Sequence, residues 1–209
     1  MQKLPKKHKK CRFCQKLRNI LLILFSTLGI LSVLVFLPQW FKFANNTGDI
    51  FFKVEKAESV LSDGSYFINA RLKMDFTPEV IEALENGVAL NLIIEVKVWQ
   101  QQSWMDKLVK ESTQRFEYRY NALTGIHSMM HVSTGQKYNF DSREDALALL
   151  GNIHHAHLIT QKELDDTCHH KVEIRVLLDI WSLPTALRPV ASLSPQWRLE
   201  SEWYSWMLN

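Results

Sequence analysis

The sequence predicts a mainly β protein: an antiparallel β-sandwich-like domain with two short helices, preceded by one N-terminal transmembrane helix. Two observations lead to this prediction. A run of uncharged, mostly apolar residues occupies positions 20–41, near the N-terminus. Several segments in the rest of the chain alternate apolar and polar residues, as half-buried strands do. With seven glycines and six prolines in 209 residues, the composition is neither collagen-like nor of low complexity.

The charge of the chain divides into two unlike regions. Residues 1–19 hold eight lysines and arginines and no acid, whereas residues 20–209 hold 17 basic and 22 acidic residues. We therefore assign residues 1–19 to a basic cytoplasmic tail that rests on anionic lipid headgroups. The remainder is mildly acidic, so we expect no nucleic-acid partner for it.

The apolar run predicts a membrane anchor, which we assign to residues 20–42. At about 1.5 Å per residue it makes roughly 33 Å of helix, enough to cross a bilayer core. The alternative is a cleaved signal peptide, but its apolar region would be about 7–15 residues and a small-residue cleavage pattern would follow. The tail places the N-terminus in the cytoplasm. We therefore expect a single-pass protein of the cell inner membrane with its C-terminal domain in the periplasm.

After a polar linker at residues 43–49, residues 50–209 form the predicted extracytoplasmic domain. Its first two strands are expected at residues 51–60 and 66–76, joined by a turn at Asp63-Gly64. Strict alternation predicts further strands, each with one face in the core. They are expected at residues 90–99, 115–120, 126–132, 171–180 and 197–207.

Two short helices interrupt the strands. Thr77 followed by Pro78 is typical of a helix start, and Gly87 ends that helix. Ser142 can cap the second helix, which is expected at residues 143–150. Residues 152–170 are expected to form a solvated loop, and the Leu-Pro and Arg-Pro pairs within residues 183–189 favour an extended, non-helical run.

Several segments of this domain resemble a family of bacterial single-pass, membrane-anchored, periplasm-facing proteins whose shared domain has no known function. The matching pieces, in order, are Ala83-Leu84-Glu85-Asn86-Gly87-Val88 with the strand after it, Arg119-Tyr120-Asn121-Ala122-Leu123, Phe140, Ala146-Leu147, residues 175–179, Leu183-Pro184-x-x-Leu187-Arg188-Pro189 and Trp197-x-Leu199-x-Ser201-x-Trp203. The resemblance covers most of residues 50–209. It implies a periplasmic domain behind one anchor and hints at signalling, but it implies no activity.

A histidine-rich segment offers candidate metal ligands. His154, His155 and His157 are followed by Cys168, His169 and His170. Imidazoles and a thiol are ligands for zinc or copper, and of these we single out His154, His157, Cys168 and His169. Against a site, the spacing lacks the i, i+4 pattern of a helical zinc motif, and polar residues between two structured elements usually make a loop. We therefore expect no cofactor and keep metal or small-ligand binding by residues 154–170 as the alternative.

No catalytic motif is present: the chain has no G-x-S-x-G, no Walker P-loop and no G-x-G-x-x-G. Glu79, Glu82 and Glu85 follow each other at i, i+3 and i+6, which places them on a solvated helix surface. Cys168 is the one thiol after the predicted anchor, so a disulfide within this domain is excluded. We expect the protein not to be an enzyme.

Tryptophans are frequent in the predicted domain, and the last strand carries large rings on both faces. Trp197 and Trp203 lie opposite Tyr204 and Trp206 by alternation. We expect one set to fill the core, and the other either to pack under a loop or helix or to contact a partner. Tyr204 and Trp206 are the candidates for partner contact. We expect a protein-interaction module with a membrane or periplasmic protein partner, in envelope signalling or assembly.

Overall fold

The computed structural model describes residues 51–165 and 167–208 of the chain. The predicted basic tail (1–19), transmembrane helix (20–42) and linker (43–49) lie outside the described residues. No helix within the described ranges is long and apolar enough to cross a membrane.

The strands are β1 Phe52–Ser62, β2 Ser65–Met74, β3 Leu90–Gln100, β4 Lys107–Asn121, β5 Ile126–His131, β6 Lys137–Phe140, β7 Asn152–Thr160, β8 His170–Leu178 and β9 Tyr204–Met207. The α-helices are α2 Pro78–Glu85, α3 Arg143–Gly151 and α4 Arg188–Leu193, and short 3-10 helices are η1 Gln161–Glu163, η2 Ile180–Ser182 and η3 Pro195–Trp197.

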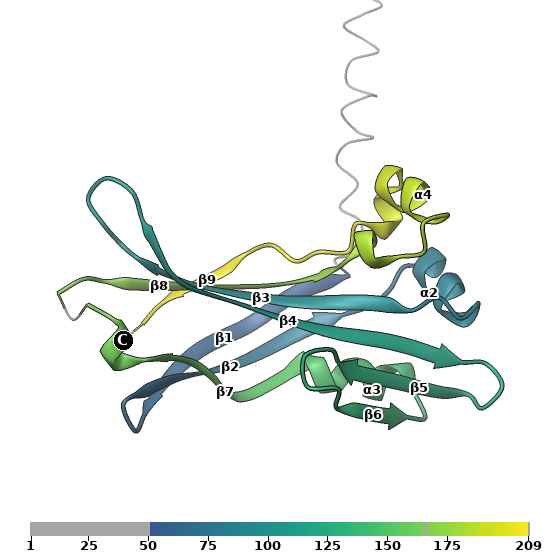
Figure 1. Cartoon of the computed structure of the whole chain (residues 1–209), viewed down its shortest axis with the longest axis horizontal. Coiled ribbons are helices and arrows are strands. Elements are labelled where there is room, and N and C mark those ends of the chain that lie inside the picture. The colour runs from purple at the N-terminus through teal and green to yellow at the C-terminus, as the bar shows by residue number, and fades with distance from the viewer. Residues whose placement is uncertain (1–50, 166, 209) are drawn as a thin grey trace, which may run out of the picture. The chain divides into compact units, whose positions relative to one another are not determined.

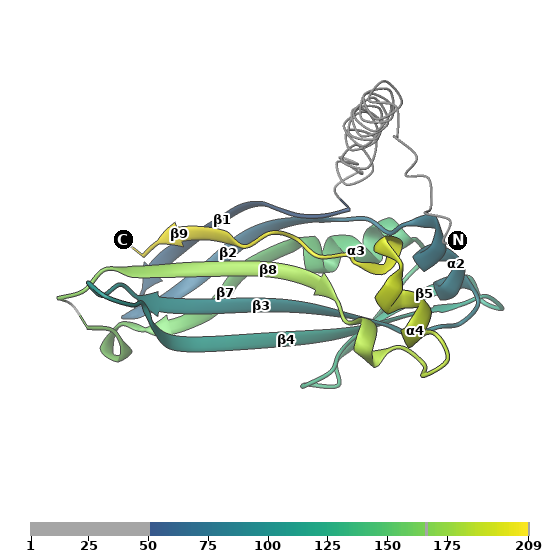
Figure 2. The same cartoon turned by 90° about the horizontal axis from the view of Figure 1, so that it is seen from above.

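The strands form two antiparallel sheets, which confirms the mainly β prediction (Figures 1 and 2). The smaller sheet has the order β1-β2-β7, and the larger has the order β6-β5-β4-β3-β8-β9. β1 lies against β8 and β9 of the larger sheet. Written this way, the two orders run in opposite directions, because β1 begins one and β9 ends the other. β7 therefore lies on the β4 side of the sandwich, and residues of both strands line one groove.

The predicted alternation is confirmed in the central strands. In β8 every second side chain is buried, from His170 through Val172 and Ile174 to Leu178. In β3 the inner face includes buried Leu90, Leu92, Ile94 and Val98, although Val96 is only half-buried and Ile93 of the other face is buried too. These faces meet the inner side of the smaller sheet in one hydrophobic core, whose largest fully buried side chain is Tyr118 of β4.

The predicted turn and both predicted helices form for the expected reasons. Asp63 and Gly64 both have positive φ, 49° and 71°, as a two-residue hairpin turn requires. The Thr77 hydroxyl accepts a hydrogen bond from the backbone N–H of Val80, and Ser142 caps α3 in the same way through Asp145.

Two segments differ from the predictions. Residues 152–160 were expected to be a loop but form β7, an edge strand. The three histidines of β7 are exposed, and His155 has a φ of 50°. The alternation of apolar and polar residues by which a strand is predicted is therefore interrupted in this segment. Residues 188–193 were expected to be extended but form α4, because Pro189 lies in the first turn, where its missing N–H costs nothing.

The last predicted strand is also shorter than expected. Of residues 197–207, only Tyr204–Met207 form β9, and Leu177 makes an isolated bridge with Glu200. Trp197 belongs to η3 and is buried. The hydrogen bond from the Thr77 hydroxyl to the Gln196 carbonyl, at 2.9 Å, ties this segment to the start of α2.

Candidate functional site

One long side of the sandwich is open, and it is bounded by two strand edges. β4 pairs with β3 along most of its length, but β5 pairs only with Phe116–Asn121. Within the described residues, no strand pairs with the other edge of β4 from Lys107 to Gln114. β7 is likewise the last strand of its sheet. The open side, as we call the space between these two edges, is therefore lined by unpaired backbone groups.

One hydrogen bond shows which way the unpaired backbone N–H and carbonyl groups of β4 point. The N–H of Val132 donates to the carbonyl of Arg115 at 2.9 Å, so the polar groups of Arg115 point away from β3. Backbone groups alternate in direction along a strand. Those of Thr113 and Glu111 therefore point into the open side, whereas those of Ser112 point to Val96 of β3.

A groove of about 390 Å³ occupies the end of the open side next to α3. β4 contributes Phe116, β5 contributes His131 and β6 contributes Tyr138, while β7 contributes Ile153 and His154. The rings of Phe116 and His131 are in contact, tilted by 57° with their centroids 4.7 Å apart. The groove thus combines apolar surface with a few polar groups, a composition suited to side chains of a bound segment.

The opposite end of the β4 edge carries two exposed apolar residues. In the connection between β3 and β4, Trp104 is 97% exposed and Met105 is 74% exposed. Leu108, at the start of β4, is also exposed. Trp and Met are enriched at protein interfaces, and an exposed Trp has no packing role of its own.

The other long side of the sandwich is closed, and it contains the predicted partner-contact residues. Tyr204 and Trp206 of β9 are half-buried and pack against the core. The Trp206 indole N–H donates to the Ser59 hydroxyl of β1 at 2.8 Å. The Trp206 side chain thus joins β9 to β1. The large ring on the outer face is Trp203, which lies under Lys97 and Arg175.

The structure separates the candidate metal ligands into two places. His154, His155 and His157 lie on β7, where His155 stacks on Phe67 at a centroid distance of 3.9 Å. His157 meets the same ring edge-on. Within the described ranges, no three His, Cys, Asp or Glu side chains lie close enough together to hold a metal ion.

Cys168, His169 and His170 lie where the chain enters β8. The Gln100 side-chain amide donates to the Cys168 sulfur at 3.0 Å, and the His169 carbonyl accepts from the N–H of Gln101. His170 is buried and its Nε2 has no hydrogen-bond partner among the described residues. This arrangement holds the β8 start against β3, and Cys168 is a free, half-buried thiol.

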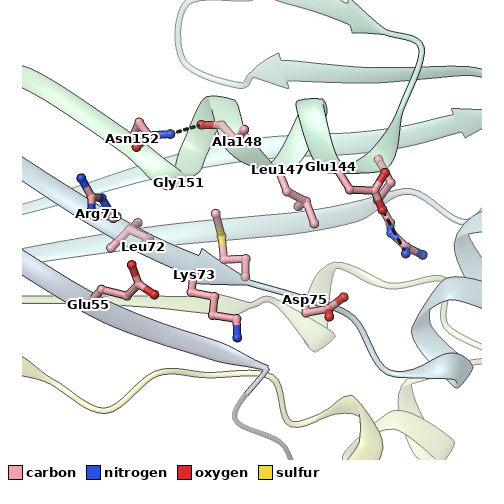
Figure 3. Close-up of a pocket in the computed structure, with 12 residues that line it drawn as sticks. Glu55, Arg71, Leu72, Lys73, Asp75, Glu144, Leu147, Ala148, Gly151 and Asn152 are labelled. Atoms are coloured by element: carbon pink, nitrogen blue, oxygen red, sulfur yellow. Dashed lines mark hydrogen bonds and ion pairs between the residues drawn. The ribbon is translucent and has the colours of Figure 1, made fainter.

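A second hollow, of about 420 Å³, lies between α3 and the β1–β2 pair (Figure 3). Arg71, Lys73 and Arg143 contribute positive charge to its wall, and Glu55, Asp75 and Glu144 contribute negative charge. Because the two signs balance, this hollow does not select a ligand of one charge. Its floor is the junction of α3 with β7, where the Asn152 side chain donates to the Ala148 carbonyl at 3.2 Å.

One buried polar pair lies beneath α3. The Tyr118 hydroxyl and the Nδ1 atom of His127 are 2.7 Å apart. Burial raises the pKa of the Tyr118 hydroxyl, so it stays protonated and donates to a neutral imidazole. Burial, and next the charge of Arg143, lowers the pKa of His127. The pair thus contributes a neutral hydrogen bond between β4 and β5.

The residues of the open side were not singled out from the sequence. Glu111 and Thr113 lie in a stretch of β4 that is polar on both faces, so it shows no alternation. Trp104 was counted among the tryptophans but not distinguished from the buried ones. A strand that is polar on both faces beside a strongly apolar one is the signal that marks an uncovered edge.

Of three comparisons with known proteins, one finds a match for this chain. Neither the curated proteins nor the solved structures include a match to the chain. The family described as "Domain of unknown function (DUF4390)" matches residues 51–207, which includes both sheets. The chain therefore belongs to this family of proteins with a domain of unknown function.

Proposed function

We propose that the protein is a single-pass protein of the bacterial inner membrane whose periplasmic β-sandwich binds an extended segment of a protein partner along the free edge of β4. The observation that carries this proposal is the unpaired backbone of β4 from Lys107 to Gln114. A partner strand added there would satisfy the groups of Glu111 and Thr113. It would continue the larger sheet past β4, in line with β5.

Both ends of this edge offer places for partner side chains. The groove at Phe116, His131 and Tyr138 lies at one end, and Trp104 with Met105 lies at the other. Main-chain hydrogen bonds along an edge supply affinity without sequence preference, and flanking pockets supply specificity. The anchor and the orientation come from the apolar run and the basic tail, and a role in envelope signalling or assembly is part of the proposal.

Site-specific photo-crosslinking in intact cells tests the proposal. One crosslinker replaces Glu111 on the open side, and a matched one replaces Glu58 on β1, at the closed side. The two glutamates are suitable because their side chains are 46% and 49% exposed and each pairs with a lysine. We expect a discrete adduct from position 111 and none from position 58. Adducts of equal yield from both positions would contradict the proposal.

Two proline variants show whether the adduct depends on the edge itself. Thr113→Pro removes an N–H that points into the open side, so we expect the adduct to be lost while the fold is kept. Ser112→Pro removes an N–H that points to β3, so we expect it to destabilise the sheet. A folded Thr113→Pro variant that still gives the full adduct would rule out strand addition at β4.

A further inference from the structure

The segment from η2 to α4 carries a cluster of exposed apolar side chains, which we call the α4 patch. Leu193 is 86% exposed, Trp181 is 68% exposed and Val190 is 59% exposed. Val190 and Leu193 are three residues apart and share one face of α4. The opposite face of α4 is held by buried Ala191, and α4 packs against η2, which contains Trp181.

The charge of this segment differs from that of the rest of the domain. Between Ile180 and Leu199 there are two arginines, Arg188 and Arg198, and no aspartate or glutamate. The nearest flanking acids are engaged elsewhere, since Asp179 lies 3.9 Å from Arg115 and Glu200 lies 3.9 Å from Arg175. The α4 patch is therefore apolar and weakly cationic on a domain that is acidic overall.

The patch lies at the end of the domain where the described chain begins. The Phe51 carbonyl accepts a hydrogen bond from Asp75, and Thr77, two residues later, bonds to Gln196 in the segment after α4. Figures 1 and 2 show the start of β1, α2 and α4 at this same end of the sandwich. Trp104 lies beyond the other end of β3, whose 11 residues span about 35 Å.

We propose that the α4 patch lies on the bilayer surface, with Trp181, Val190 and Leu193 in the headgroup region and the two arginines facing anionic lipid phosphates. This inference rests on the proposed membrane anchor. Only residues 43–50 separate the predicted span from Phe51, and eight extended residues reach at most about 28 Å. An apolar face flanked by arginines is the composition of a surface that binds at a membrane interface.

The test uses the full chain in vesicles of zwitterionic lipid with and without 30% phosphatidylglycerol. An environment-sensitive dye is attached to Leu193→Cys or to Trp104→Cys, with Cys11, Cys14 and Cys168 replaced by serine. Nitroxide-labelled lipids then quench any dye that lies in the headgroup region. We expect quenching at position 193 to be at least threefold greater than at position 104, and to increase with phosphatidylglycerol.

A charge substitution distinguishes the patch from general proximity to the membrane. With the dye at Trp181→Cys, Leu193→Asp is expected to reduce quenching at least twofold. Leu123→Asp, a matched change at a leucine that is 98% exposed in the β4–β5 turn, is expected to leave it unchanged. Equal quenching at positions 193 and 104, or equal loss with both aspartates, would overturn the inference.

Flotation of the same vesicles separates this inference from the anchor on which it rests. A chain that floats with the vesicles but shows no quenching at position 193 keeps the anchor and overturns the docking of the α4 patch. A chain that does not float overturns the anchor, and the docking with it.

Discussion

The two long sides of the sandwich are built differently. On the closed side, the Trp206 indole of β9 donates to Ser59 of β1, and the half-buried ring of Tyr204 packs against the core. On the open side, β4 and β7 end in unpaired edges, and the inward residues Ser112 and Gln114 are exposed. Aromatic rings therefore seal one side, whereas polar side chains leave the other accessible.

The difference is that the large aromatic side chains cover the strand edges on one side of the sandwich only. Natural proteins cover or shorten exposed strand edges, because such edges pair with other chains. Here β9 is four residues long and is covered, but β4 runs for 15 residues and half of one edge is free. The free part of this edge is mostly polar, and the predictions below separate the two sides.

The largest effect is expected on the closed side. Trp206→Ala removes a half-buried ring and its hydrogen bond, and should lower the free energy of unfolding by about 3 kcal/mol. Trp206→Phe keeps most of the ring and should cost about 1 kcal/mol. Gln114→Ala, on the open side, should change the value by less than about 0.5 kcal/mol. Urea unfolding of the full chain in detergent, followed by circular dichroism, measures all three, and equal losses on both sides would refute the distinction.

A somewhat smaller effect is expected where α3 closes the end of the open side. A Cβ atom at Gly151 would lie 2.9 Å from the carbonyl oxygen of Leu72. Gly151→Ala must therefore displace α3 from β2 and should cost about 2 kcal/mol. Asn152→Ala, at the next and exposed position, serves as the control in the same unfolding experiment. A Gly151→Ala variant as stable as the parent would show that this close approach is not required.

The smallest effect concerns pH and the Tyr118–His127 pair beneath α3. Burial lowers the pKa of His127 in the folded state, whereas in the unfolded state the imidazole has its ordinary pKa of about 6.5. At a pH below this value, the unfolded state therefore binds the proton more readily than the folded state. The free energy of unfolding should therefore decrease as pH falls from 7 to 5.

His127→Gln keeps a hydrogen-bond acceptor for the Tyr118 hydroxyl but does not titrate. The decrease between pH 7 and 5 should be shallower in this variant. Unfolding midpoints measured at several pH values compare the two proteins, and parallel curves would exclude His127 as the source.

The sequence predicted the sheets wherever one face of a strand is fully buried. β8 alternates strictly and β3 does so apart from buried Ile93 and half-buried Val96, and the Asp63-Gly64 turn requires residues that accept positive φ. β7 was missed because an exposed edge strand with a bulge at His155 shows no alternation. α4 was missed because Pro189 was interpreted as a helix breaker, although it lies in the first helical turn.

The candidate site was less predictable than the fold. Tyr204 and Trp206 were chosen as partner contacts because alternation separates two faces but does not say which one meets the core. The histidines were grouped because they are close in sequence, yet β7 and β8 belong to different sheets. An open edge such as that of Glu111 and Thr113 depends on which strands lie beside it, and a single strand's sequence does not contain that information.

The pairing of β3 with β8 has a consequence for the order in which the chain folds. Leu92 of β3 pairs with Leu178 of β8, which is synthesised 86 residues later. β3, the central strand of the larger sheet, therefore lacks this partner until β8 has been made. Until then β3, a strongly apolar strand, has β4 on one edge and nothing on the other. A chain interrupted before β8 would present this edge to other molecules, and pairing of the central strand is therefore tied to the synthesis of β8.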